Sequence, residues 1–392
     1  MPSTVILSAV RTPLGSFRGG LASVSAPQLG ATVIRAAMAQ AQVAPDEITD
    51  VIMGNVLQAG QGQAPARQAT LAAGLPPRAR SVTVHKVCGS GIQAVMQGSH
   101  AIGAGDAGLV IAGGMESMSS APYLLPKVRD GYRLGHHQVI DSIVHDGLWD
   151  PYNNLHMGSC AEHCAKKYSF TREQQDAFAI ASYQRANAAQ EDGSFGDQII
   201  PVEVTDARRA TSLIEQDEEP SKVNYSKLPS LRPSFENAGT ITAANASSIS
   251  DGAAALLIAS ESAATERGIK PLARIVSFGG YAHDPLWFTT APIQAAIIAL
   301  KRASWSVADV DLWEVNEAFA VVPMAFMREL DVPHDKINIH GGAIALGHPI
   351  GATGTRIIVT LLANLRQRGL RRGVAALCIG GGEGMAVCIE RI

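Results

Sequence analysis

The sequence predicts an α/β protein made of two similar halves, and three observations support this prediction. Strand-like and helix-like segments alternate over the first 117 residues. The last third repeats this order, and two strand–Gly–Gly segments, DAGLVIAGGMES and RGVAALCIGGGEG, indicate a duplicated unit. Because helices placed between strands form crossover connections, the strands are expected to build a mostly parallel sheet.

In the first part of the chain, short apolar runs indicate strands, and the longer segments between them indicate helices. The expected strands are Val5–Val10, Asp50–Leu57, Ser81–Val87 and Gly108–Ala112. The expected helices are Pro27–Gln40, Ala64–Ala73 and Gly91–Ile102. Ser25 lies near the start of the first helix, where its oxygen can cap free backbone N–H groups.

The last third shows the same alternation. Strands are expected at Pro271–Ser277, Val310–Val315, Ile337–Ile339, Val374–Ile379 and Ala386–Glu390. Helices are expected at Pro292–Arg302, Ala318–Leu330 and Gly351–Arg366.

Residues 118–249 differ from both flanks, because seven prolines interrupt them and strand signal is sparse. Thr171 and Gln174 form a capping-box pattern that opens a helix to about Ala189, whereas residues 206–236 are predicted to be an exposed loop. An insert this long is usually functional, so a lid or a platform for a substrate carrier is expected. The chain then divides into a first half (1–117 with about 250–270), a loop domain (118–249) and a second half (271–392).

The composition disfavours several classes of protein and of partner. The chain has 392 residues, 46% of them hydrophobic, and a net charge of −3. This favours a globular protein and disfavours a nucleic acid or an anionic membrane as partner, although a local basic patch would suffice for a nucleotide-bearing acyl carrier. Five cysteines, no secretory or organelle leader pattern and no long apolar run predict a cytoplasmic protein with free thiols.

Cys88 ends a predicted strand in VHKVCGSG, directly before a helix. Backbone N–H groups and the helix dipole at that turn are expected to lower the pKa of the thiol and to hold an oxyanion. This would suit a nucleophile. A buried structural cysteine is the alternative, since free cysteines are commonly buried.

His348 lies in the glycine-rich run GGAIALGHPIGATG, followed by a helix. A histidine in such a turn can accept a proton from Cys88; a phosphate-cradling loop and a plain tight turn are the alternatives. Cys378 ends another strand and enters Gly380-Gly381-Gly382, where a ligand can approach the backbone closely. One thiol as nucleophile and one as base suit chemistry that forms a thioester and attacks it with a carbon.

Three further patterns give a weaker or an ambiguous signal. Asn316 follows a predicted strand, where it can cap a helix or hold a water that faces the substrate. Cys160, His163 and Cys164, with His156, share a helical face, but their spacing is not that of a structural zinc site. The Gly103–Gly108 segment matches a dinucleotide fingerprint but precedes a strand, so the required context fails.

Taken together, VCGSGIQAV, NEAFA, GGAIALGHPIGATG and CIGGGEGMA resemble the thiolase family in order and spacing over essentially the whole chain. The resemblance implies a five-layered α-β-α-β-α fold of two duplicated halves with a coenzyme A-binding loop domain. It also implies acyl-CoA substrates in lipid metabolism and a homotetramer, or at least a dimer. It implies that Cys88 accepts the acyl group, His348 activates it and Cys378 takes the α-proton. One oxyanion hole would combine His348 with a water held by Asn316, and the other the backbone N–H groups of Cys88 and Gly380.

Other residues match the short-chain acetoacetyl-CoA thiolases. His156 and Met157 narrow the acyl pocket in that subgroup, Phe288 and Phe319 match pocket positions, and Ser247 matches the pantetheine contact. Residues that match the nucleotide-binding positions are Lys222, Val223, Asn224 and Lys227. Residues that match a potassium site in cation-activated members are Tyr183, Ala243, Ala244, Ala246 and Ile344.

The resemblance therefore implies an acetyl-CoA C-acetyltransferase with no required cofactor and modest K⁺ activation. Phe288 is also typical of members that cleave 2-methylacetoacetyl-CoA, whereas Glu383 departs from the Met, Gln or Gly usual at its position. Alternatives are a thiolase of broader chain length, a non-catalytic acyl-CoA- or lipid-binding relative and a cysteine hydrolase. The last two leave Cys378 without a role.

Overall fold

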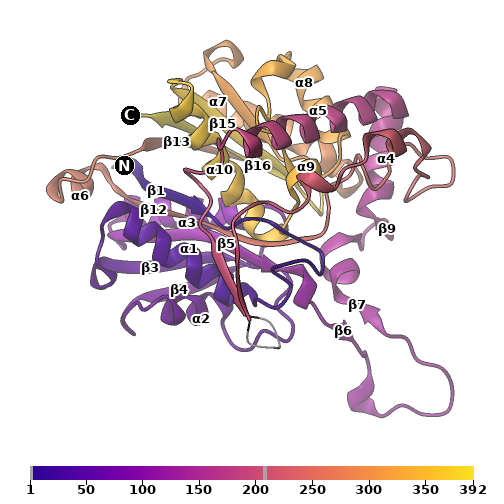
Figure 1. The fold of residues 1–392 in the computed structure, drawn as a ribbon, viewed down its shortest axis with the longest axis horizontal. Coiled ribbons are helices and arrows are strands. Elements are labelled where there is room, and N and C mark those ends of the chain that lie inside the picture. Colours follow the sequence, from indigo (N-terminus) through magenta and orange to yellow (C-terminus); the bar gives the residue numbers. More distant parts are fainter. Residues whose placement is uncertain (1–2, 206–209) are drawn as a thin grey trace.

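A computed structural model describes residues 3–205 and 210–392, and its main feature is one continuous ladder of strands (Figure 1). The strand order is β14-β15-β16-β13-β1-β12-β5-β3-β4, with β2 paired to β12. The first half supplies β1 (Thr4–Arg11), β2 (Gly15–Ser16), β3 (Ile48–Gly54), β4 (Arg80–Val84), β5 (Leu109–Ser117) and β12 (Ser250–Ser260). The second half supplies β13 (Ala273–Ala282), β14 (Leu312–Val315), β15 (Arg372–Ile379) and β16 (Glu383–Arg391).

The two halves meet at β1 and β13, which pair antiparallel through only three residue pairs. Read outward from this junction, β1-β12-β5-β3-β4 matches β13-β16-β15-β14, so the order supports a duplicated unit. The strand predicted at Ile337–Ile339 is wrong, because only a parallel bridge between Ile337 and Trp313 occupies the place matching β4. Asn338 turns the chain away with φ 46°. Its side chain then bonds to the N–H and C=O of Val315, in place of a neighbouring strand.

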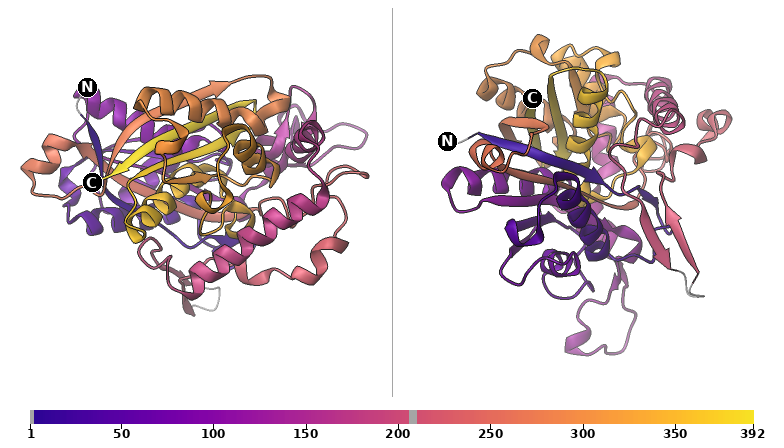
Figure 2. Two further views of the ribbon diagram at one scale, coloured as in Figure 1. Left: turned by 90° about the horizontal axis from the view of Figure 1, so that it is seen from above. Right: turned by 60° about the vertical axis from the view of Figure 1, so that its left-hand side comes forward.

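Helices form three further layers. α3 (Ser90–Ala104) and α10 (Ile350–Gln367) contact each other between the two halves, α1 (Ala26–Ala41) and α2 (Pro65–Ala72) cover the first half, and α7 (Ala291–Ala303) and α8 (Val321–Leu330) cover the second. Figure 2 shows the indigo-to-purple half on one side of these central helices and the orange-to-yellow half on the other. The predicted five-layered α-β-α-β-α fold is confirmed. The expectation of a mostly parallel sheet is wrong, because in the described residues β3 pairs parallel with β4 and β5 and β14 pairs parallel with β15, whereas every other strand pairing of this sheet is antiparallel.

The two central helices approach closely at the ends that begin near Cys88 and His348. A Cβ at Gly91 would lie 2.5 Å from the backbone nitrogen of Thr355, and a Cβ at Gly354 would lie 2.5 Å from that of Ile92. Every residue of α10 from Ile350 to Leu365 is buried. These glycines therefore set the spacing of the layer from which both candidate catalytic residues project.

The inserted region packs along one side of this core. It contains the helices α4 (Met157–Tyr168) and α5 (Arg172–Glu191), and the strand pairs β6 (Tyr123–Leu124) with β7 (Ile140–Asp141), β8 (Trp149–Asp150) with β9 (Leu155–His156), and β10 (Val202–Thr205) with β11 (Thr211–Ile214). The Thr171 capping box is confirmed. The exposed loop predicted at 206–236 is wrong in part, because β11 lies within it; residues 206–209 fall outside the described residues.

Two short helices complete the fold, α6 (Glu261–Glu266) and α9 (Ala343–Leu346). The segment between β6 and β7 projects from the body of the molecule as a long loop (Figure 1). In the described ranges, no helix combines the length and apolar character needed to span a bilayer.

Candidate active site

A largely apolar pocket of about 480 Å³ brings together parts of both halves and of the insert. The sequence-predicted residues that line it are Cys88, His156, Met157, Ala243, Ala246, Ser247, Phe288, Phe319, His348 and Gly380. Other lining residues were not predicted from the sequence, among them Met118, Leu148, Glu219, Phe235 and Ile249. These residues are far apart in the chain, and the fold alone brings them together.

Cys88 reaches this pocket from a strained turn between β4 and α3. Val87, a β-branched residue, has φ 47°, a conformation that such residues rarely adopt. The hydroxyl of Ser90 holds the turn by accepting from the N–H of Lys86 at 2.8 Å and donating to the carbonyl of Val87 at 2.7 Å. The turn places Cys88 directly before the N-terminus of α3.

The predicted lowering of the Cys88 thiol pKa is wrong in its net direction. Burial raises the pKa to about 11. Hydrogen bonds from the backbone of Gly380 and of Cys88 itself act in the expected direction but are outweighed, and the charge of Glu116 adds to the rise. The sequence identifies the helix terminus correctly, but it cannot show how deeply the second half and the insert bury the thiol.

His348 is held in one tautomer by a neighbour that the sequence analysis missed. Its Nδ1 lies 2.6 Å from Oγ1 of Thr353, and that hydroxyl donates its own proton to the carbonyl of Pro349 at 2.9 Å. The Thr353 oxygen must therefore accept, so Nδ1 carries the proton and Nε2 keeps its lone pair. Nε2 is buried and has no partner among the described residues. Burial, together with the charge of Arg356, lowers the His348 pKa to about 3, so the ring is neutral.

Cys378 lies at the end of β15, opposite Gly384 of β16. It is fully buried and lies outside the set of residues that line the pocket. Burial raises its pKa well above the ordinary value, and the charge of Cys88 raises it further. The following loop needs glycine, since Gly381 and Gly382 have φ of 92° and 84°.

Asn316 does not cap a helix, because α8 begins five residues later with Ala320 as its N-cap. Its backbone N–H bonds to the carbonyl of Ala376 at 2.9 Å, which ties it to β15. Nη2 of Arg356 lies 3.5 Å from Oδ1 of Asn316. Nδ2 is buried without an acceptor in the described parts of the chain. The structure therefore excludes the role of a helix cap for Asn316. The other role, in which Nδ2 donates to a water or a substrate group, remains.

Aromatic rings form one wall of the pocket. Phe235 stacks on His156 with ring centroids 4.7 Å apart, and Phe319 meets the edges of Phe235 and Phe288 at 6.0 and 6.4 Å. Nδ1 of His156 accepts from the N–H of Gly158 at 3.0 Å, so the other ring nitrogen carries the proton. Together these rings limit the volume available to an acyl chain.

The residues predicted to bind the nucleotide lie outside the pocket on an exposed segment. Lys222, Asn224 and Lys227 are exposed and Val223 is half-buried. The segment starts at Glu219, which lines the pocket, and Lys222 contacts Glu219 at 3.6 Å and the hydroxyl of Ser16. Ser247 lies closer to the centre, where its hydroxyl donates to the carbonyl of Ala318 at 3.0 Å.

The predicted potassium residues are mostly buried around the loop before β12. Tyr183 is buried, and burial, together with the charges of Glu219 and Glu317, raises its pKa well above the ordinary value. The carbonyl of Asn245 accepts a backbone hydrogen bond. Among the backbone hydrogen bonds of the described residues, the carbonyl of Ala246 accepts none.

Buried charged groups next to the pocket were not anticipated from the sequence. Glu116 accepts hydrogen bonds from the backbone N–H groups of Val56, Leu57 and Gly351 and from the side chain of Asn55, at 2.8–3.2 Å. Burial raises the Glu116 pKa to about 7. No local motif marks this glutamate, because its partners come from two segments that are distant from it in the chain.

The cysteine cluster in the insert forms part of the core. Cys160 and Cys164 are fully buried among apolar side chains. Within the described residues, no three His, Cys, Asp or Glu side chains are grouped as a metal site would require.

Comparison with known proteins gives one consistent picture. Residues 4–262 match the family described as "Thiolase, N-terminal domain", and residues 269–391 match "Thiolase, C-terminal domain". The chain is 51% identical over 394 aligned residues to an acetyl-CoA acetyltransferase of Escherichia coli (strain K12), and 48% identical over 392 to one of Cupriavidus necator, with all of each chain covered.

Two solved structures are also similar. One is Acat5 thiolase from Ascaris suum in complex with coenzyme A, with TM-score 0.94, 42% identity and full coverage of both chains. The other is the Bacillus anthracis acetyl-CoA acetyltransferase, with TM-score 0.98, 41% identity and coverage of 100% of this chain and 99% of that one.

Proposed function

Because the chain belongs to the thiolase family, we propose that it is an acetyl-CoA C-acetyltransferase, which joins two acetyl-CoA into acetoacetyl-CoA and CoA and catalyses the reverse reaction. One observation supports this most strongly. Cys88 and a neutral His348 with a free Nε2 line the same apolar pocket, next to Gly380. This is an arrangement for acyl transfer to a thiol.

In the first step, the Cys88 thiol attacks the thioester carbonyl while His348 Nε2 takes its proton. The carbonyl oxygen becomes an oxyanion, and the backbone N–H groups of Cys88 and Gly380 stabilise it. CoA leaves and takes the proton back from His348. The product is acetyl-Cys88.

In the second step, the Cys378 thiolate takes an α-proton from the second acetyl-CoA, and the resulting carbanion attacks the carbonyl of acetyl-Cys88. The C–S bond of the Cys88 thioester then breaks and acetoacetyl-CoA is released. The Cys88 sulfur leaves as a thiolate and takes up the proton that Cys378 had accepted, which restores the Cys378 thiolate. His348 and a water held by Asn316 Nδ2 stabilise the enolate oxygen. A high pKa makes this thiolate a strong base once formed. The proposal requires that the methyl group of the bound thioester reach this buried sulfur.

We assign the acyl pocket to His156, Met157, Phe288 and Phe319. Coenzyme A contacts are assigned to Ser247, Lys222, Val223, Asn224 and Lys227, whose segment starts at the pocket. Lysine charges suit the phosphates of the nucleotide. The domain boundaries given above, with 118–249 as the loop domain, belong to this proposal, as does a cytoplasmic location, which five unpaired thiols favour.

Thiolysis rates against acyl chain length test this function. We expect acetoacetyl-CoA to be cleaved much faster than 3-ketoacyl-CoA of six or more carbons, because aromatic rings close the acyl side. Equal rates across the series would indicate a thiolase of broader chain length, and no cleavage of any member would indicate a binding protein. Some cleavage of 2-methylacetoacetyl-CoA is expected; its complete absence beside normal acetoacetyl-CoA cleavage would reject the role of Phe288.

We also propose a potassium site framed by Tyr183, Ala243, Ala244, Ala246 and Ile344. Bound K⁺ would brace the loop that carries Ser247. Turnover should be modestly higher in K⁺ than in Na⁺ or choline buffers; equal turnover in the three would reject the site.

A homotetramer is the proposed assembly. The loop between β6 and β7 exposes several apolar side chains, and such patches usually mark contact surfaces. They are Leu125, Val128, Tyr132, Leu134 and Val139.

A further inference from the structure

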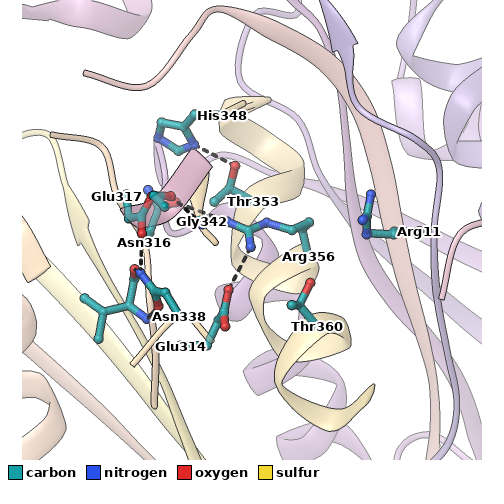
Figure 3. Close-up of polar contacts among 12 residues, drawn as sticks. Arg11, Glu314, Asn316, Glu317, Asn338, Gly342, His348, Thr353, Arg356 and Thr360 are labelled. Atoms are coloured by element: carbon teal, nitrogen blue, oxygen red, sulfur yellow. Dashed lines mark hydrogen bonds and ion pairs between the residues drawn. The ribbon is translucent and has the colours of Figure 1, made fainter. Parts of the chain in front are cut away.

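A buried polar cluster lies directly behind Asn316 and His348, and no step of the reaction above uses it (Figure 3). At its centre Arg356 and Glu314, each only 1% exposed, form an ion pair with 2.9 Å between Nη1 and Oε1. Taking two charges out of water is costly, and apolar residues of similar volume often serve stability equally well. We therefore expect this ion pair to have a role in function in addition to any role in stability.

Arg356 shares one face of α10 with the residue that orients the candidate base. Thr353 and Arg356 are three residues apart, so their side chains project on the same side of the helix. Figure 3 shows Thr353 reaching His348, and Arg356 reaching Asn316 and Glu314 from the next turn. One helix, buried from Ile350 to Leu365, thus carries the residues that contact both His348 and Asn316.

The chemistry of the guanidinium fixes the orientation of the Asn316 amide. Arginine has only donors, so the amide atom that faces it must be the oxygen. The contact is long, 3.5 Å between Nη2 and Oδ1, but the opposite orientation would set two donors against each other. With the oxygen engaged, Nδ2 points away from Arg356 and remains free.

We propose that Arg356 is a positioning residue for the thiolase reaction. It orients the Asn316 amide so that Nδ2 is the donor offered to the reacting groups, and its charge behind His348 keeps the imidazole in the base form. Glu314 holds Arg356 in place. This inference rests on the proposed function.

The electrostatics of His348 agree with this geometry. Burial is the main cause of its lowered pKa, and Arg356 is the one charged group that lowers it further. The other titratable groups around the ring belong to several elements. They are Cys88 before α3, Cys378 on β15, Glu116 on β5, and Glu314 and Glu317 at β14.

The test measures single-turnover acetylation of Cys88 by acetyl-CoA between pH 5 and 9. Arg356→Lys keeps the charge but loses the planar fork, so kcat should fall about tenfold while KM stays within about threefold. The double variant Arg356→Met with Glu314→Gln removes the positive charge of Arg356 and leaves no unpaired charge at position 314. Its rate should fall more toward acidic pH than that of the unchanged protein, because loss of the Arg356 charge raises the His348 pKa.

A matched control comes from a second buried pair, Arg11 and Asp217, which is fully buried with Nη–Oδ distances of 2.7 and 2.8 Å. Arg11→Met with Asp217→Asn should lower stability but leave the pH profile of the folded enzyme unchanged. If the Arg356 variants lose activity only in proportion to their folded fraction, with the profile of the control, the inference is wrong.

Arg356→Lys retains the charge and the bulk of the side chain. It therefore tests the positioning role of Arg356 even if the double variant Arg356→Met with Glu314→Gln does not fold. An unchanged kcat in this variant would overturn the positioning role. Failure of the proposed function would show differently, as absence of Cys88 acetylation in the unchanged protein.

Discussion

At the scale of single residues, the candidate nucleophile Cys88 and the candidate base His348 are both neutral. Burial raises the pKa of Cys88 to about 11, and burial with Arg356 lowers that of His348 to about 3, so both groups are uncharged over the neutral range. The residue types were predictable from four sequence motifs, three of which are rich in glycine. Thr353 and Arg356 were not, because a threonine or an arginine within an apolar helix carries no local signature of its partner.

The structure also gives a role to Glu383, which the sequence marked as unusual. Its carboxylate pairs with Lys86, two residues before Cys88, and thereby ties the Cys88 turn to the strand that follows Gly380–Gly382. We expect Glu383→Gln and Lys86→Met each to slow Cys88 acetylation about 2–5-fold, because a half-exposed pair contributes at most about 1 kcal/mol.

The double variant is expected to be no slower than either single one, since both remove the same interaction. The rate of the unchanged protein should approach theirs at 1 M salt. Fully additive effects in the double-mutant cycle would show that the two side chains act independently.

At the scale of elements, periodicity and turn chemistry predicted most helices and strands. The helix predicted at Pro27–Gln40 is Ala26–Ala41, and that at Gly351–Arg366 is Ile350–Gln367. The errors have physical causes. The side chain of Asn338 replaces a strand at one edge, and β11 is too short and polar to give a strand signal.

Glu116 shows how one side chain links elements from different parts of the chain, and its titration predicts the pH dependence of stability. Its folded pKa of about 7 lies above the ordinary value of 4.5 for a glutamate side chain. Between these values the folded state holds a proton that the unfolded state releases, so stability falls as pH rises through this window. The contribution is about 3 kcal/mol, from about 1.4 kcal/mol per pKa unit.

Glu116→Gln removes this titration. Urea unfolding at pH 4.5 and pH 8, at one protein concentration, should show a steeper loss of stability with pH in the unchanged protein than in the variant. Parallel losses in both would contradict the assignment.

At the scale of the whole molecule, two α/β halves are joined through one short strand pairing and a shared pair of helices. The pocket forms where those helices begin, so neither half contains a complete site. The sequence predicted the duplication from repeated order. It did not predict which ends of the helices would meet, because this depends on the close packing of Gly91 against Gly354.

The long loop between β6 and β7 predicts the behaviour of the assembly. Leu134 is fully exposed on it, so Leu134→Asp should weaken the proposed tetramer by placing a charge in an apolar contact. Mass photometry would measure the change. Leu213→Asp, on the exposed strand β11, is the matched control and should stay tetrameric; the same mass distribution for both variants would argue against the role of the loop.

The central claim is that Cys88 carries the acetyl group and Cys378 moves the α-proton. Intact-protein and peptide mass spectrometry after incubation with labelled acetyl-CoA tests it most directly, alongside an assay for acetoacetyl-CoA. The account predicts no acetyl label at position 88 in Cys88→Ala, and a label on Cys88 without carbon–carbon bond formation in Cys378→Ala. Acetoacetyl-CoA formed by either variant at the rate of the unchanged protein would contradict it.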